Sequence, residues 1–543
     1  MTTFNRLIRL LPSLVLVAAA TISSSQVSAG QQRASQPQTV SGQVVNSITG
    51  EPIARARVQV GAQQATLTDH DGHFEFDNVS EEPAYAFASK PGYFAEDKAV
   101  PAQGQSITLK LIPEAILFGT ITDQNGQPIQ DLPVQLTMLR VENGLRRWRP
   151  MQGTTTNVEG QFRFAELQAG QYSLATGFRI EGLVDAPSSV AFMPVAFPPL
   201  TGDGIRGALT LRPGEQVEAN ASPAMEKLYP VTGVINGMVG QGAGFTVLTK
   251  DGEPVDSPVN IFPGGGFRLR LPTGSYRLKV HSAVEREQWF AGTREISVSE
   301  APLQGISVTL EPPAILPIEV EYQAVTTASQ NAPGGPPPYL NASLQDEDPR
   351  GPGQMFPAQP RKPPGRGQAL EAGDPMVFRD VEPGRYMLEA QPQPPWYVAS
   401  ASCGNLDLTR DPLVIGTGAG ACTVRMVYRD DAASLKWLAS PSEDGSGAGN
   451  EVSVIAIPLD SLTQPAMNST IIADHPLSSD SPAEGSFDGL APGRYLVMAL
   501  PHRQDLPYRD HEALQRYMSL GQEITLTRGG KSEVQLKIVT GEP

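Results

Sequence analysis

One phrase, repeated along the chain, constrains the fold more than any other feature. Ser486 to Ala499 reads S-F-D-G-L-A-P-G-R-Y-L-V-M-A, and close copies run from Phe378 to Leu388 and from Phe164 to Leu174. In each copy a phenylalanine precedes a tyrosine by eight positions, with a glycine-containing turn between them. Glycine supplies the positive φ of a tight connection, and we expect the flanking aromatic residues to bury area on one sheet face. Looser copies at Phe267 to Tyr276 and Phe76 to Tyr85 bring the expected number of similar β units to five.

The length and composition of the chain agree with a string of such units. At 543 residues the chain is too long for one core, and several domains of about 100 residues are expected. Gly (53) and Pro (50) are frequent, yet 40% of the residues are hydrophobic, which favours short strands joined by turns over disorder. The net charge of −16 argues against a nucleic-acid partner, because phosphate binding needs a cationic face. The predicted fold class is therefore all-β, a tandem array of about five antiparallel β-sandwich domains.

The first 29 residues have the pattern of a secretory signal peptide. Arg6 and Arg9 precede an apolar run from Leu10 to Ala20, and Val27-Ser28-Ala29 is a small-residue cleavage site. The apolar run is short for a transmembrane helix, and no second apolar span follows. We therefore expect an exported protein, in the periplasm, outside the cell or on its surface, with no transmembrane segment in the mature chain.

The repeated phrase and the turn signals around it divide the chain. Residues 1–29 are the signal peptide, and the β-sandwich domains are expected at 38–112 (domain one), 113–213 (domain two), 228–311 (domain three), 313–430 (domain four) and 431–541 (domain five). Domain two carries a long hairpin insertion, and a polar linker, residues 214–222, follows it. Residues 331–367 are rich in Pro and Gly, so they are expected to form a disordered insertion in domain four. A short helix near residues 508–520 is expected in domain five, packing on the sandwich edge.

Domain one also carries a family signature. The run G-x-V, G-x-P-I-x-x-A-x-V, T-D-x-D-G-x-F-x-F and Y spans Gly42 to Tyr85. It resembles the carboxypeptidase regulatory-like domain, and the resemblance implies transthyretin-like or Ig-like sandwiches. Domains two to five resemble the family more loosely, and the whole chain looks like multi-domain exported bacterial proteins that carry such repeats. The resemblance implies no particular activity, because these domains accompany many unrelated exported proteins.

The sequence contains no recognisable catalytic set. The H-x-x-E pair of the zinc carboxypeptidases, the H-E-x-x-H zinc motif and the G-x-S-x-G nucleophile elbow do not occur. The run from Asp69 to His73 favours a hairpin turn over a metal loop, and Gly416-T-G-A-G-A favours a hairpin because a strand-like segment follows it. We therefore predict no enzyme activity, no cofactor and no metal site.

Arg146, Arg147, Trp148 and Arg149 are the candidate binding residues. They form a basic, aromatic segment on an acidic chain, in an insertion where loops carry binding, and Trp and Arg are frequent interface anchors. The alternative is a tryptophan that folds back on its own sheet.

Cys403 and Cys422 are the two cysteines of the chain. In an oxidising compartment a disulfide between them is the natural interpretation, and the alternative is a pair of buried thiols.

Two functional hypotheses follow. The first is an exported, non-catalytic protein with a structural or interaction role in the cell envelope. The alternative is a protein that binds carbohydrate or another envelope polymer. The partner is then an envelope protein or a polysaccharide, and the sequence does not determine the oligomeric state.

Overall fold

The computed structural model describes most of the chain after residue 37. The described residues are 38–61, 64–79, 85–95, 106–181, 189–199, 207–239, 242–250, 252, 254–284, 288–325, 340–347, 354–362, 375–416, 422–441, 451–473, 477–478 and 481–539. The expected signal peptide lies outside them. The chain divides into two compact units, Met1–Pro113 and Glu114–Pro543.

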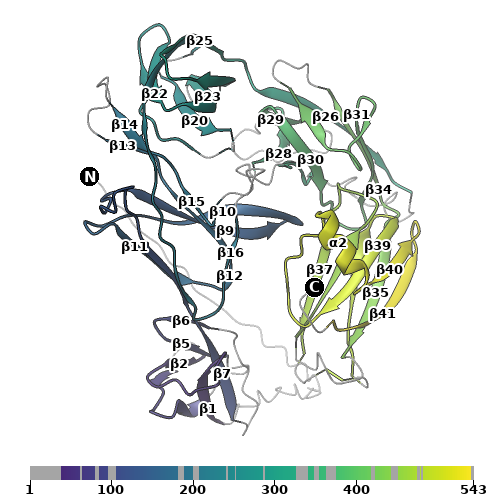
Figure 1. The fold of residues 1–543 in the computed structure, drawn as a ribbon. Helices are drawn as coiled ribbons and strands as arrows, with labels where there is room; N and C mark the ends of the chain where they lie inside the picture. Colours follow the sequence, from purple (N-terminus) through teal and green to yellow (C-terminus); the bar gives the residue numbers. More distant parts are fainter. Residues whose placement is uncertain are drawn as a thin grey trace, which may run out of the picture. The chain divides into compact units, whose positions relative to one another are not determined.

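One strand-pairing pattern occurs five times in the part of the chain that the structure describes. Figure 1 shows the chain as a ribbon. In each copy a first strand pairs antiparallel with the strand that carries the repeated phenylalanine and parallel with a later strand of the same domain. The first, phenylalanine and last strands are β1 (Gln38–Asn46), β4 (His73–Val79) and β7 (Ile107–Pro113); β8 (Ala115–Thr120), β11 (Gln161–Leu167) and β17 (Gln216–Glu218); β19 (Tyr229–Asn236), β22 (Gly266–Leu271) and β25 (Leu303–Thr309); β26 (Ala314–Gln323), β29 (Met376–Val381) and β34 (Val424–Arg429); β35 (Ala433–Ser440), β38 (Ala483–Leu490) and β41 (Lys531–Lys537). The all-β array of five similar units is confirmed.

The strand that follows the glycine turn pairs with a different partner strand in each domain. These pairs are β5 (Ala86–Ser89) with β2 (Arg57–Val60), β12 (Gly170–Thr176) with β9 (Pro133–Glu142), β23 (Gly274–Val284) with β20 (Gly244–Thr249), β30 (Gly384–Ala390) with β27 (Ala342–Asp346), and β39 (Gly493–Leu500) with β36 (Glu451–Pro458). The sequence predicted that the two aromatic residues of the repeated phrase lie on one sheet face. In domains two, three and five they lie instead on two different sheets. The turn of the phrase leads the chain to a second set of strands, and in domains two to five both rings are buried in the core.

The remaining strands extend these sheets or form small additional ones. They are β3 (Gln64–Leu67), β6 (Tyr93–Ala95), β10 (Leu145–Thr155), β13 (Arg179–Glu181), β14 (Val190–Phe192), β15 (Ala196–Phe197), β16 (Leu209–Leu211), β18 (Met225–Lys227), β21 (Asn260–Ile261), β24 (Gln288–Val298), β28 (Met355–Pro360), β31 (Tyr397–Cys403), β32 (Leu406–Asp407), β33 (Leu413–Ile415), β37 (Met467–Ile472) and β40 (Gln522–Leu526). In domain four β28 pairs with both β27 and β29, so the two halves of that domain form one continuous sheet.

The repeated tyrosine makes the same hydrogen bond in four domains. Its hydroxyl donates to the backbone carbonyl oxygen four residues earlier, inside the turn, at 2.8 to 3.2 Å; the residues are Tyr172, Tyr276, Tyr386 and Tyr495. This is the contact known in β-sandwiches as the tyrosine corner. It explains why the phrase keeps tyrosine rather than phenylalanine at this position, because a buried turn carbonyl needs a donor. In domain one, where the phrase is loosest, Tyr85 is 50% exposed.

A glycine on the first strand of domains one, two and three permits close approach of the last strand. A Cβ on Gly42, Gly119 or Gly233 would overlap a backbone carbonyl oxygen of the neighbouring segment. It would also contact a phenylalanine ring on the strand that carries the repeated phrase; these rings are Phe74, Phe162 and Phe267. The ring lies over the glycine across the antiparallel pair in each case. The pairing of a small residue with a large ring is thus a second repeated feature of the array.

Two expected segments differ from the structure. The stretch 214–222, expected to be a polar linker, contains β17, and Ala219 after it is buried in the core of domain two, so that domain extends beyond residue 213. The insertion 331–367, expected to be disordered, contains β27 and β28, and Leu344 in β27 is fully buried. In both segments short alternating strands lie between Pro- and Gly-containing stretches, whose composition dominated the prediction.

The predicted helix is present as α2 (His511–Met518). The Asp510 side chain caps its first turn by accepting hydrogen bonds from two backbone N–H groups. Ala513 and Tyr517 are buried against the side chains of β36 and β39 that point away from the sandwich core, among them Leu496 and Met498. The helix therefore covers the outer face of a sheet rather than its edge, as Figure 1 also shows.

Candidate functional site

The basic segment of domain two lies in the β9–β10 hairpin. Its turn is Asn143-Gly144, whose φ values of 49° and 78° are typical of the two-residue turn favoured in hairpins. The Arg509 backbone N–H donates to the Gly144 carbonyl oxygen at 3.0 Å. The ring of Tyr508 lies only 2.6 Å from where a Cβ on Gly144 would stand. The tip of the hairpin therefore rests on the segment that precedes α2 in domain five.

The arginines of this segment are engaged within the chain. Arg147 is only 4% exposed and donates to the backbone carbonyl oxygen of Asp346 in domain four. The Arg146 guanidinium lies 3.3 Å from the carboxylate of Asp510, the residue that caps α2.

The other two candidate residues differ in their surroundings. Arg149 forms an ion pair with Glu142 on the opposite strand, and its hydrogen bonds hold the pKa of that carboxyl below its usual range. Trp148 is half-buried, on the strand face opposite Arg147. A role of Arg146, Arg147, Trp148 and Arg149 in binding an external ligand stays a prediction, and three of the four already have partners in the chain.

The two cysteines are joined in domain four. Cys403 ends β31 and Cys422 lies just before β34, and the structure contains a disulfide between them, with Cα atoms 5.7 Å apart. Cys403, at the end of β31, is part of the buried apolar cluster of this domain, and Cys422 packs against that cluster. The bridge therefore fastens the segment before β34 to the core.

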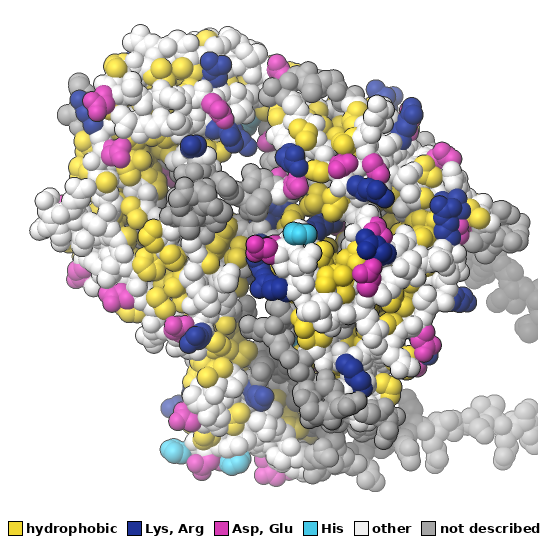
Figure 2. Space-filling view, turned by 45° about the vertical axis from the view of Figure 1, so that its right-hand side comes forward, with side chains coloured by type: hydrophobic (Ala, Val, Ile, Leu, Met, Phe, Trp, Pro, Cys, Tyr) yellow, Lys and Arg dark blue, Asp and Glu magenta, His cyan; other side chains and the backbone are white. Residues whose placement is uncertain are grey.

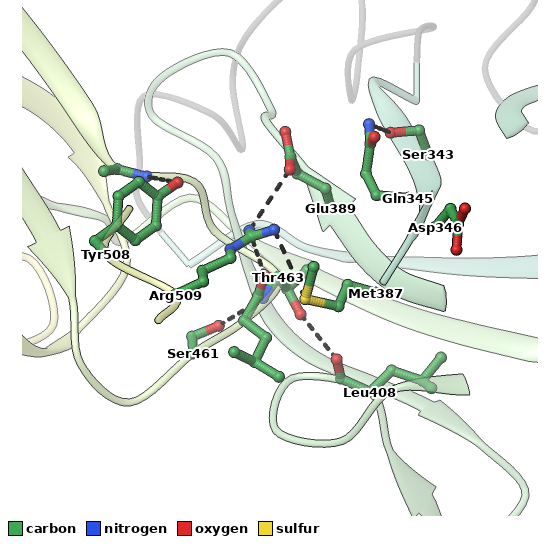
Figure 3. A network of polar contacts seen from close by, with 12 residues as sticks. Ser343, Gln345, Asp346, Met387, Glu389, Leu408, Ser461, Thr463, Tyr508 and Arg509 are labelled. Atoms are coloured by element: carbon green, nitrogen blue, oxygen red, sulfur yellow. Dashed lines mark hydrogen bonds and ion pairs between the residues drawn. The ribbon is translucent and has the colours of Figure 1, made fainter. Parts of the chain in front are cut away.

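The junction of domains four and five is built around a buried arginine. The Arg509 side chain is only 5% exposed and its guanidinium lies 3.5 Å from the Glu389 carboxylate (Figure 3). It also donates to the Leu462 carbonyl oxygen at 3.0 Å and lies 3.8 Å from the Met387 sulfur. Burial raises the pKa of Glu389 above its usual value, and the neighbouring arginine opposes that shift. Arg509 of domain five thus pairs with a carboxylate of domain four and also bonds a loop of its own domain.

That loop, residues 459–466 between β36 and β37, is fixed from several sides. The Leu462 N–H donates to the Thr409 carbonyl oxygen at 2.7 Å, and the Ala390 N–H donates to the Thr463 carbonyl oxygen at 2.8 Å. The Thr463 hydroxyl donates to the Leu408 carbonyl oxygen at 3.2 Å (Figure 3). These bonds cross from domain five to domain four. A surface loop with this many backbone partners is held in one conformation.

A cavity of about 310 Å³ opens beside this loop, between the two domains. Domain four contributes the run from Gln391 to Pro394 together with Tyr397, and domain five contributes Gln464 and neighbouring residues. The walls combine proline and tyrosine rings with amide side chains. Sequence reasoning missed this cavity, because it is formed by segments far apart in the chain; the one local signal was the proline- and glutamine-rich run that precedes Trp396-Tyr397.

Other segments that the sequence singled out serve the fold where the structure describes them. The Asp69 side chain accepts hydrogen bonds from the backbone N–H groups of Asp71 and His73 at 2.9 and 2.8 Å, as the turn interpretation predicts. Trp396 is 7% exposed and packs edge-on against Tyr322 in domain four. The glycine-rich stretch after Gly416 lies outside the described residues.

The charge distribution on one face of the described residues favours no single partner class (Figure 2). On the face in Figure 2, basic and acidic side chains are interspersed rather than gathered by sign. Within the described ranges no three His, Cys, Asp or Glu side chains are grouped as metal ligands would be. In the same part of the chain no helix has the length and apolarity needed to cross a membrane.

Comparison with solved structures gives distant similarities. The Bacillus anthracis TIE protein is 13% identical, with 51% of each chain covered and a TM-score of 0.16, so the similar region spans about half of that chain. GBS52, the minor pilin of Streptococcus agalactiae, is 14% identical over 34% of this chain and 95% of its own, with a TM-score of 0.19. The shaft pilin SpaA of Lactobacillus rhamnosus GG is 14% identical over 38% of this chain and 99% of its own, with a TM-score of 0.13. At these TM-scores the similarities carry no information on function.

Comparison of sequences is more specific for one domain. No curated protein matches the chain. The family described as the carboxypeptidase regulatory-like domain matches residues 39–111, which are nearly the whole of β1 to β7. Domain one is therefore a carboxypeptidase regulatory-like domain, as its signature from Gly42 to Tyr85 predicted.

Proposed function

We propose that this chain is an exported, non-catalytic β-sandwich protein with a structural or interaction role in the cell envelope. The observation that carries the proposal is the junction of domains four and five. Domains in one chain usually meet through small polar interfaces that permit relative motion. Here backbone hydrogen bonds and the buried Arg509 side chain cross the junction, so the two domains are held as one body.

A fixed junction between sandwiches suits a protein that spaces or presents a surface. An enzyme cleft that opens and closes between domains would instead need a hinge, and hinges have few buried cross-domain contacts. The contacts of the β9–β10 hairpin with domains four and five add to the same effect, because they connect domain two to the junction. Envelope proteins or polysaccharides are the partners that such a role implies.

Export is supported by two features of the sequence. The first is the signal-peptide pattern of residues 1–29. The second is the pair Cys403 and Cys422, since disulfides persist in oxidising compartments outside the cytoplasm.

The experiment compares the full chain with a matched chain that lacks residues 2–29, each carrying a C-terminal epitope. Cells are fractionated and the N-terminus of the exported species is sequenced. We expect the full chain in the envelope or extracellular fraction, beginning at Gly30, and the shortened chain in the cytoplasm. A full chain that stays in the cytoplasm, or that is exported but restores no envelope property in a host from which it was deleted, would contradict the proposal. Resistance to osmotic shock and to detergent are the properties to be measured.

A further inference from the structure

The cavity between domains four and five has the features of a preformed ligand site. Its volume of about 310 Å³ is at the lower end of the range for small-molecule sites, roughly 300–1,000 Å³. One of its walls is the loop 459–466, which the cross-domain bonds of Leu462 and Thr463 hold in place. A ligand would therefore meet a site that needs little reorganisation on binding.

The walls of the cavity offer apolar rings. Pro392 and Pro394 of domain four face the cavity together with Tyr397, and Pro465 and Met467 come from domain five. The Tyr397 hydroxyl is bonded to Asp431 at 3.1 Å and the residue is only 4% exposed, so the prolines and Met467 supply most of the apolar surface. Such walls suit the C–H faces of a ligand rather than its polar groups.

The rim of the cavity offers uncharged hydrogen-bonding groups. Gln391 and Gln393 line it and are exposed, and Gln464 lines it from the other domain. The Gln464 side-chain amide oxygen accepts from the Ala491 N–H at 3.3 Å and lies 2.7 Å from the Tyr495 hydroxyl oxygen. This fixes the amide, while its nitrogen donates to no described residue and is left to serve a ligand oxygen.

The charge of the lining selects the class of ligand. Among the described residues that line the cavity none is Lys, Arg or His, and Asp488 is the one ionisable acid. An anionic ligand would face a carboxylate without any cation to offset it. A neutral sugar has apolar C–H faces and several hydroxyl groups, which match ring walls and an amide rim. We propose that this cavity binds a neutral saccharide unit of roughly one or two rings, the size a cavity of this volume accommodates.

A proline-rich peptide is the competing ligand, since aromatic grooves also bind such segments. It is less favoured, because peptide grooves of that kind present several exposed aromatic rings and Tyr397 is only 4% exposed. The saccharide proposal does not rest on the envelope role, and each can fail without the other.

The test uses the mature chain, Gly30 to Pro543, and saturation-transfer NMR. The probes are glucose, galactose, mannose, N-acetylglucosamine and their disaccharides, with a decaproline peptide and glucose 6-phosphate as comparators. Gln464→Glu keeps the oxygen that holds the loop but replaces the donor nitrogen. Gln393→Trp fills the cavity from an exposed position. Gln171→Glu, on an exposed position of β12, is the matched control.

We expect at least one neutral sugar to bind the parent chain and the Gln171→Glu control equally. Its affinity should fall at least tenfold in both Gln464→Glu and Gln393→Trp. Hydrogen exchange of the Ala390 and Leu462 amides should stay at parent levels in these variants, which shows that the junction is intact. Binding of no neutral sugar, binding that survives both cavity variants, or binding of decaproline or the phosphate ester in place of sugar would overturn the proposal.

Discussion

Replacement of Arg509 by methionine tests how the junction of domains four and five is held. Methionine retains the length of the stem but removes the charge and the donor. The Glu389 carboxylate, whose side chain is 15% exposed, then has no cation 3.5 Å away, and the Leu462 carbonyl oxygen loses its 3.0 Å donor. Removing one partner of a buried ion pair costs about 3–5 kcal/mol, because the other charge is left in a poorly solvated place. We take about 3 kcal/mol, since Glu389 is not fully buried.

Hydrogen exchange followed by mass spectrometry measures this cost locally. The Ala390 and Leu462 amides are both bonded across the junction, at 2.8 and 2.7 Å, so their exchange reports its opening. A loss of about 3 kcal/mol raises the opening equilibrium roughly 150-fold, since 1.36 kcal/mol is a factor of ten. Arg425→Met is the matched control, because that arginine is 72% exposed and its surface ion pair is worth about 0–1 kcal/mol. Exchange at the two junction amides should not change in the control.

The double variant Arg509→Met/Glu389→Leu separates charge from packing. Replacing a whole buried ion pair by apolar residues is often neutral, so we expect most of the protection to return. Lowering the pH should also relieve the single variant. A carboxyl whose folded-state pKa is raised by burial destabilises the fold above that pKa, and the penalty disappears as the pH falls through it. Unchanged exchange in Arg509→Met, or a double variant as unprotected as the single one, would refute the argument that an uncompensated charge opens the junction.

Three further predictions concern the sandwiches themselves. Burial raises the pKa of Tyr276 from 10.0 to about 12. The stability contributed by its neutral phenol should therefore be present below pH 10 and lost as the pH rises through 12. In alkaline unfolding followed by circular dichroism, Tyr276→Phe should lose less stability over this range than the parent chain. Gly144→Val should loosen the β9–β10 hairpin by about 1–3 kcal/mol through both its φ of 78° and the overlap with a tyrosine ring, and limited proteolysis should cut it faster than Gly126→Val, which has the same φ but open space around it. Cys403 and Cys422 should resist an alkylating reagent in the exported chain until it is reduced, and their joint replacement by serine should cost about 3 kcal/mol; alkylation at both sites without reduction, seen by intact mass, would disprove the bridge.

The fold could be predicted because its determinants repeat locally. The aromatic spacing of the phrase around Tyr172, Tyr386 and Tyr495 reflects one hydrogen bond in one turn, which these copies share. Such a rule is visible in a single sequence. What it does not reveal is which strands the turn connects, and the assignment of both aromatic residues to one sheet face was therefore wrong.

The errors in the segment assignments have a common physical cause. Residues 331–367 were expected to be disordered because Pro and Gly dominate them, yet Leu344 completes the core of domain four. The stretch 214–222 looked like a linker because it is polar, yet β17 in it is a short outer strand whose side chains largely face solvent. Composition averages over a segment, whereas a strand needs only a few alternating positions to add to a sheet.

The candidate site was beyond sequence reasoning for a different reason. The cavity depends on Gln464 and Tyr397 meeting across a junction, and no local pattern encodes that meeting. The basic segment illustrates the complementary error. On a chain with net charge −16 a run of arginines looks like a recognition tip, but such a chain also supplies acceptors, and here Arg147 and Arg146 reach Asp346 and Asp510 within the same molecule. An external ligand at this hairpin would have to displace those contacts, leaving acceptors of the chain unpaired, while the cavity demands no such exchange. In an acidic protein whose basic residues form interdomain contacts, an uncharged cavity is therefore a better candidate ligand site than the most basic segment of the surface.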